Sequence, residues 1–147
     1  MISPLPSAIQ GVLDDLAFLE DRRARIEYLI AIGESYRPAD EQEVPRRDEA
    51  KVAGCESEVF FHSEKMPEGR VRVRYAVDNP QGISAMAMAK VLEDGVSNVE
   101  PERVAAIPDS LAEEMFGQEL SMGKGMGLGH MVRMAKEAAR DAHERTS

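Results

Sequence analysis

Tryptophan is absent from this 147-residue sequence, and its only cysteine is Cys55. One cysteine cannot close a disulfide within the chain, which excludes the disulfide-stapled class of small secreted domains. No uncharged stretch approaches the length that crosses a bilayer, and the N-terminus has no basic segment followed by an apolar run. We therefore expect a soluble, cytoplasmic protein with no membrane association, in which the thiol stays reduced.

Basic residues are also few, and they are scattered along the chain. The 27 acidic residues outnumber the 18 basic ones, so the net charge is -9 and no basic stripe could follow a phosphate backbone. Nucleic acid is not an expected partner. The three histidines, His62, His130 and His143, show no metal-ligand spacing with the cysteine, and the glycine-rich residues 123–129 lack the order of a phosphate-binding loop. We expect neither a metal nor a cofactor.

The pattern of apolar residues predicts one domain over residues 1–147. Hydrophobic residues make up 43% of the chain, which is enough for a core of its own. Helical spacing predicts helices near residues 7–20, 21–36 and 83–95, a short helix after Pro101, a turn or two at 110–117, and a last helix from about 127. Ser7 with Gln10 predicts a capping box for the first helix, and Asp21 predicts a cap for the second.

Two runs of β-branched and aromatic residues predict strands, at about 57–63 and 70–78, joined as an antiparallel hairpin. Residues 51–53 are a candidate third strand, and the charged, proline-containing residues 38–50 are predicted to be a surface loop. The order of elements predicts an α+β fold, a small antiparallel sheet of two to three strands with helices packed on one face.

Cys55 follows Gly54 at the entrance to the first predicted strand, where it could be a packing residue, a crosslink point or a nucleophile. His62 cannot be its base, because an extended chain puts the two α-carbons about 23 Å apart with side chains on opposite faces. His130 could approach through folding, but a single histidine on a helix is more often a surface or packing residue. A thiol without an evident base still suits thiol exchange, in which the partner brings the reactive sulfur.

Four segments in order carry a resemblance to a known family. Residues 52–59, VAGCESEV, resemble the V-x-G-C-Q-S-Q-V signature of the SufE family. Residues 25–33, RIEYLIAIG, resemble its R-x-x-Y-L-I-x-L-G; Asp78 falls where the family has an aspartate ahead of its central helix; and residues 120–128, LSMGKGMGL, resemble its L-S-P-S-R-x-x-G-L. The resemblance spans about residues 9–140, and it implies a SufE/IscU-like fold related to cluster-scaffold proteins.

The resemblance implies that Cys55 accepts persulfide sulfur from a PLP-dependent cysteine desulfurase (SufS-like) and passes it to iron-sulfur cluster assembly through a downstream Fe-S scaffold. The protein would be a sulfur carrier and desulfurase activator working by transpersulfidation, rather than a stand-alone enzyme. A thiol-independent adaptor and a redox-sensing module are the alternatives. A cluster scaffold would need more thiolate ligands than one cysteine per chain supplies.

The same resemblance implies a sulfur environment around Cys55, made of Gly54, Glu56, Ser57, Glu58, Asp78 and Lys124. The two glutamates replace amides of the signature, and their carboxylates are expected to raise the thiol pKa. Lys124 stands where the family has arginine and would supply a positive charge near the sulfur. We expect residues 54–57 to pack against a loop at 123–127, which would partly cover the thiol.

Overall fold

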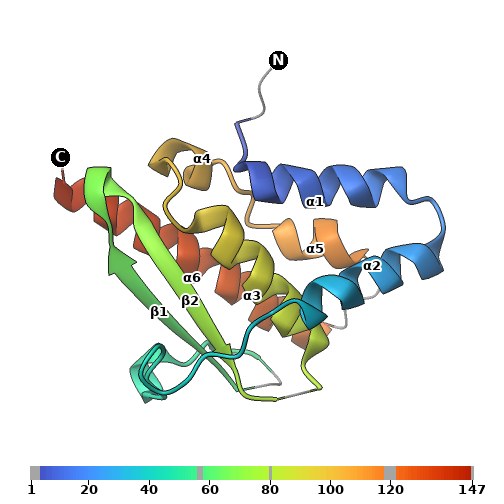
Figure 1. Ribbon diagram of the computed structural model, residues 1–147, viewed down its shortest axis with the longest axis horizontal. Coiled ribbons are helices and arrows are strands. Elements are labelled where there is room, and N and C mark those ends of the chain that lie inside the picture. Colours follow the sequence, from blue (N-terminus) through green and yellow to red (C-terminus); the bar gives the residue numbers. More distant parts are fainter. Residues whose placement is uncertain (1–3, 56–57, 80, 118–121, 147) are drawn as a thin grey trace.

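The computed structural model describes residues 4–55, 58–79, 81–117 and 122–146, without the side chains of residues 122–124 and 146. Two helices, a β-hairpin and four further helices follow one another in the expected order (Figure 1). The elements are α1 (Ser7–Phe18), α2 (Arg22–Glu34), η1 (Asp48–Ala50), β1 (Val59–Lys65), η2 (Pro67–Gly69), β2 (Val71–Val77), α3 (Ile83–Val96), α4 (Pro101–Ala105), α5 (Leu111–Phe116) and α6 (Met122–Thr146).

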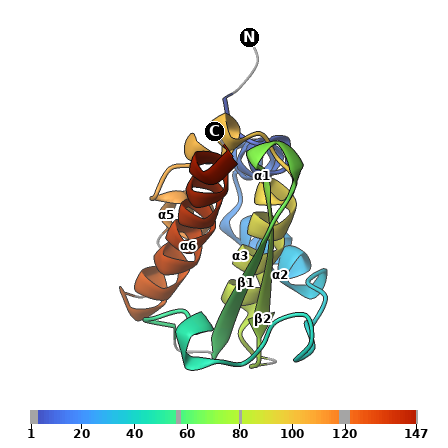
Figure 2. The same cartoon turned by 90° about the vertical axis from the view of Figure 1, so that its left-hand side faces the viewer.

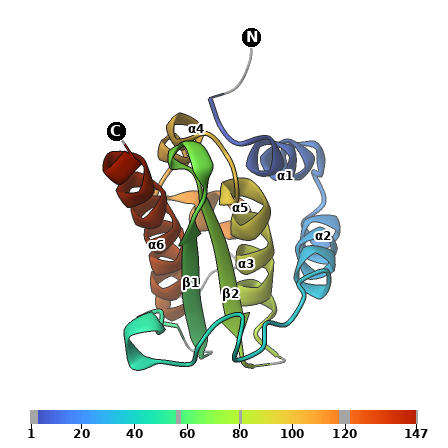
Figure 3. The same ribbon diagram turned by 60° about the vertical axis from the view of Figure 1, so that its left-hand side comes forward.

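The sheet has two antiparallel strands among the described residues, with Val59 opposite Val77 at one end and Lys65 opposite Val71 at the other. The candidate third strand at 51–53 is reduced to a single bridge between Lys51 and Phe60. The α+β fold with helices on one face is confirmed, since α3 and α6 run along the same side of the hairpin (Figures 2 and 3).

Successive side chains of β2 point to opposite faces of the sheet. Val71, Val73, Tyr75 and Val77 are buried in the main core beneath the helices. Tyr75 reaches furthest, because its hydroxyl donates a hydrogen bond of 2.6 Å to the carbonyl of Met131 in α6. The aromatic hydroxyl thereby ties the centre of the sheet to the middle of the longest helix.

The other face of the hairpin is covered by the irregular segment 37–50. The prediction of a surface loop holds for its charged residues but misses Val44, which is fully buried with Ala39, Phe60 and Ala76 in a small second core. One large apolar residue among charged neighbours has no periodicity, so the sequence gives little sign of this cover.

The edge of β2 that faces away from β1 is also hydrogen-bonded. Its partners are residues of α3 and residues that directly follow α2 and α3. The Tyr36 hydroxyl donates to the carbonyl of Tyr75 at 2.8 Å and accepts from the amide of Val77 at 3.0 Å. Further contacts on this edge are Glu93 accepting from the Tyr75 amide, Ser97 Oγ accepting from the Val73 amide and donating to the Val73 carbonyl, and the Asn98 amide donating to the Val71 carbonyl. β2 is therefore hydrogen-bonded along both edges, to β1 on one side and to these residues on the other.

The predicted cap of α1 and the predicted start of α6 need correction. α1 has Pro6 at its N-cap without a side-chain cap, so the predicted Ser7 capping box is wrong, whereas Asp21 accepts from the amide of Arg23 as predicted. α6 begins at Met122, so the glycine-rich residues form its first turns and not a loop. Packing has overridden the weak helix propensity of glycine there.

No helix in the described part of the chain combines the length and apolar character needed to span a bilayer.

Candidate functional site

The short connection from the Lys51 bridge to β1 carries Cys55, which is half-buried against the main core. Gly54, directly before it, has φ of +82°, a backbone conformation that costs other residues energy. Val52 anchors the start of the connection, because it is buried and its amide donates to the carbonyl of Val59 at 2.8 Å. The turn at Gly54 then directs Cys55 back toward α6.

Gly127 is the point at which α6 meets this connection. A Cβ placed on Gly127 would lie 2.6 Å from Cys55 Sγ, 2.7 Å from Cys55 Cα and 2.8 Å from the Gly54 carbonyl oxygen. No ordinary side chain tolerates such distances, so only glycine permits this approach. The expected contact between the thiol segment and the glycine-rich segment is therefore present, although it is made by a helix.

His130, three residues further along α6, also contacts this connection. Its Nδ1 lies 2.6 Å from the carbonyl oxygen of Ala53, and because a carbonyl only accepts, Nδ1 carries the proton and donates. That nitrogen is therefore committed to the backbone and is not placed to deprotonate Cys55. The sequence allowed His130 to approach Cys55, but only the folded structure shows that the histidine holds the preceding carbonyl.

Burial raises the pKa of the Cys55 thiol to about 11, so in this position the thiol is protonated and unreactive near neutral pH. The expected cause was different, namely the neighbouring carboxylates. Glu58 is exposed and does not account for the raised pKa, while Glu56 and Ser57 lie outside the described residues. Release of this segment from α6 would return the thiol pKa toward its ordinary value of 9.0 and increase the fraction of the nucleophilic thiolate.

Asp78, at the end of β2, forms a two-pronged ion pair with Arg46, at 2.8 and 2.9 Å. The same guanidinium donates to the carbonyls of Ala39, Asp40 and Val44, so it fastens segment 37–50 to the sheet. The structure therefore gives the Asp78 carboxylate a structural partner. The backbone of Lys124 lies in the first turn of α6, and its side chain is outside the description.

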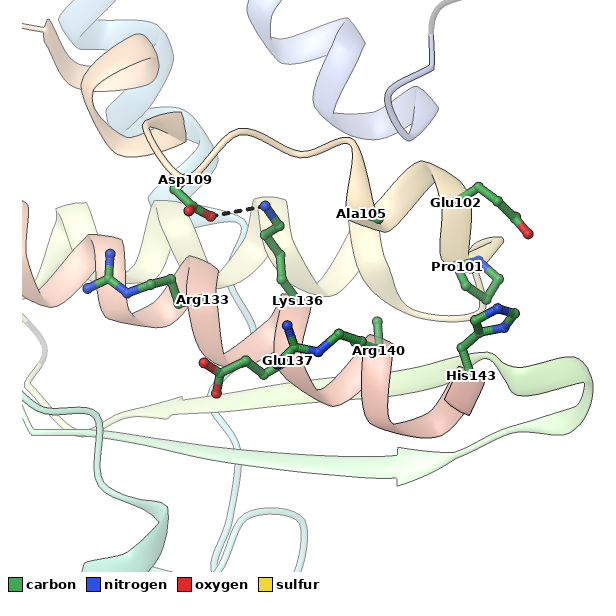
Figure 4. Close-up of a pocket in the computed structure, with 10 residues that line it drawn as sticks. Pro101, Glu102, Ala105, Asp109, Arg133, Lys136, Glu137, Arg140 and His143 are labelled. Atoms are coloured by element: carbon green, nitrogen blue, oxygen red, sulfur yellow. Dashed lines mark hydrogen bonds and ion pairs between the residues drawn. The ribbon is translucent and has the colours of Figure 1, made fainter. Parts of the chain in front are cut away.

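A separate groove of about 510 Å³ lies between α4 and the C-terminal half of α6 (Figure 4). The charged residues that line it are three basic ones, Arg133, Lys136 and Arg140, and three acidic ones, Glu102, Asp109 and Glu137. Lys136 is paired with Asp109 at 2.9 Å. This mixture favours neither an anionic nor a cationic ligand, and Cys55 does not line the groove.

Within the described residues, no three His, Cys, Asp or Glu side chains come together as a metal site.

The hairpin backed by two long helices defines an α+β fold that is also found among solved structures. The fold is similar to the solution structure of a hypothetical protein from Thermus thermophilus, with a TM-score of 0.71. The two chains share 22% sequence identity, and the match covers 97% of this chain and 99% of the other. This likeness establishes the fold.

The family follows from the sequence. The model of the SufE family, described as an Fe-S metabolism associated domain, matches residues 10–139, and the chain belongs to this family. An uncharacterized SufE-like protein of Rhizobium etli is 28% identical over 141 residues, which cover 91% of this chain and 90% of that one. Membership confirms the resemblance read from the four segments and associates the protein with Fe-S metabolism.

Proposed function

We propose that the protein accepts sulfur on Cys55 from a PLP-dependent cysteine desulfurase, activates that enzyme, and passes the sulfur on to iron-sulfur cluster assembly. The observation that carries the proposal is the setting of the thiol. Cys55 is the only cysteine in the chain, lies within the segment that resembles the family signature, and is held half-buried against Gly127. Family membership supports the same role.

The transfer is a thiol exchange that needs no outside oxidant. Cys55 loses its proton to solvent when it leaves α6, and its thiolate attacks the terminal sulfur of the desulfurase persulfide. One S–S bond forms on Cys55 as the S–S bond of the donor breaks, and the electron pair leaves on the desulfurase cysteine as a thiolate. The donor is thereby returned to its resting state, while Cys55 holds the persulfide.

The closed position of Cys55 suits a carrier of a labile group. With a thiol pKa of about 11, the buried form reacts slowly with stray electrophiles and oxidants. Transfer therefore requires a conformational change in the segment around Gly54, which brings the thiol to the partner. Glycine adopts positive and negative φ with similar ease, so Gly54 can hold its left-handed conformation and also leave it with little strain.

The decisive experiment compares the natural chain with Cys55→Ser after incubation with a cysteine desulfurase and L-cysteine. We expect intact-mass spectrometry to show the gain of one sulfur atom, removable by a reductant, on the natural chain and none on the variant. Stimulation of sulfide release should disappear with it. Circular dichroism serves as the control for folding. A Cys55→Ser protein that stimulates the desulfurase as well as the natural chain would establish the thiol-independent adaptor in place of the carrier.

A further inference from the structure

The polar contact between His130 and Ala53 has no role in the transfer chemistry itself. It joins the middle of the Cys55 connection to α6 by a 2.6 Å hydrogen bond. We propose that His130 is a positioning residue that latches this connection shut, and so sets how often the thiol is exposed. The inference rests on the proposed function for its biological meaning, but the latch is a property of the free protein.

Burial alone holds this connection weakly. Val52 is 1% exposed and stays fixed to β1, but Ala53 and Gly54 after it are both exposed. Neither residue has a large apolar side chain that could fix it in place. Cys55 adds a half-buried thiol. A hydrogen bond at Ala53, directly before the left-handed turn at Gly54, therefore acts at the point where the connection would hinge away from the helix.

The position of His130 on α6 makes the latch and the glycine contact a single unit. Residues 127 and 130 are three apart on one helix, so they lie on the same face. A Cβ on Gly54 would lie 3.3 Å from His130 Nδ1 and 3.5 Å from the Gly127 nitrogen, so both residues border the turn. Gly127 provides the room for the connection, and His130 provides the donor that retains it.

The donor atom determines which substitutions test the latch. In asparagine the side-chain amide nitrogen stands at the same number of bonds from Cβ as Nδ1 of histidine, so His130→Asn keeps a donor in reach of Ala53. His130→Ala removes the donor, while alanine is the better helix former and should leave α6 intact. His143→Ala is the matched control, because His143 is an exposed histidine of the same helix, outside this contact.

The test measures iodoacetamide alkylation of Cys55 in the free protein, with each rate divided by that of the same variant unfolded in urea. Loss of a hydrogen bond should increase exposure, so we expect His130→Ala to react about three to ten times faster than the natural chain. His130→Asn and His143→Ala should react at nearly the natural rate. Urea unfolding of each variant measures global stability in parallel.

Three results would each overturn the latch. One is a rate for His130→Ala no faster than that for His143→Ala. Another is an equal acceleration in His130→Asn, which would assign the effect to ring packing. The third is an acceleration that global unfolding fully explains. Because no desulfurase is present, the latch can hold while Cys55 accepts no sulfur, or fail while Cys55 does, so the two proposals are tested separately.

Discussion

At the scale of single residues, two glycines of α6 differ in what a methyl group would meet. On Gly127 it would collide with the backbone and thiol of Cys55, whereas on Gly129 it would meet only the flexible guanidinium of Arg133, at 3.5 Å. Gly127→Ala should therefore push the Cys55 connection off the helix and speed alkylation of the thiol. Gly129→Ala should leave alkylation unchanged and stabilise the helix by up to about 1 kcal/mol.

Alkylation kinetics and urea unfolding of these two alanine variants check the prediction. The intrinsic gain in helix propensity is the same at both positions, so the pair isolates the contact with Cys55. Equal alkylation rates in the two variants would show that the connection tolerates a side chain at position 127.

The buried thiol also predicts a dependence of stability on pH. Its folded pKa of about 11 exceeds the ordinary value of 9.0, so the unfolded chain loses this proton first as pH rises. Burial of the protonated thiol contributes stability in full below pH 9, and that contribution is lost as pH approaches 11. The unfolding free energy should fall more steeply over this range in the natural chain than in Cys55→Ala.

Urea unfolding at several pH values between about 8 and 11 measures this difference. Tyr28, whose pKa burial raises to about 12, titrates in both proteins and cancels in the comparison. Parallel slopes would mean that Cys55 leaves its buried site without a cost in stability.

Sequence reasoning singled out Cys55 and Gly54 as candidates because a glycine-cysteine pair within a family-like segment is a local signal. It did not predict the hydrogen bond between His130 and the carbonyl of Ala53, which lies 77 positions earlier in the chain. It assigned a raised thiol pKa to the carboxylates of Glu56 and Glu58, whereas burial raises this pKa and Glu58, the one of the two that is described, does not account for it. Contacts of this kind are properties of the packed structure, so no spacing in the sequence could have indicated them.

At the scale of elements, β2 carries two arginines on the same face that differ in burial and in ion pairing. Arg74 is buried and ion-paired with Glu93 at 2.9 Å, while Arg72 is exposed. Arg74→Ala would leave the Glu93 carboxylate largely buried without its cation, and we expect a loss of about 3–5 kcal/mol. Arg72→Ala should change stability by less than about 0.5 kcal/mol.

Denaturant unfolding of the two variants measures these losses. Because both substitutions remove an arginine from one strand face, the effects on strand propensity and net charge cancel. Similar losses in the two variants would contradict a structural role for the pair between Arg74 and Glu93.

The same strand shows what the sequence pattern could and could not predict about burial. The run of β-branched and aromatic residues predicted this strand, whose Val73 and Tyr75 face the helices. It could not show that Arg74 and Ala76 are buried as well, because their cover is the irregular segment 37–50. The glycines of α6 misled in the opposite direction, since low helix propensity predicted a loop where tertiary packing sustains a helix.

At the scale of the whole molecule, exposure of Cys55 should be a local event. The connection at 53–55 is short, and its opening exposes little surface compared with unfolding of the shared core. Low concentrations of urea should therefore hardly change the alkylation rate of the natural chain. Only near the unfolding transition should the rate rise steeply.

Alkylation rates measured across a urea series, beside circular dichroism of the same samples, test this expectation. A rate that climbs from the lowest urea concentrations with the slope of global unfolding would show that the thiol is exposed only when the whole domain unfolds.

The hydrogen bonds along the outer edge of β2 have a consequence for self-association. A two-stranded hairpin usually presents two rows of free amides and carbonyls, either of which can template a strand from another molecule. In this protein Tyr36, Glu93 and Ser97 occupy the row on β2. A second copy cannot extend the sheet from that side without first removing these side chains, so the helices block strand addition at the β2 edge.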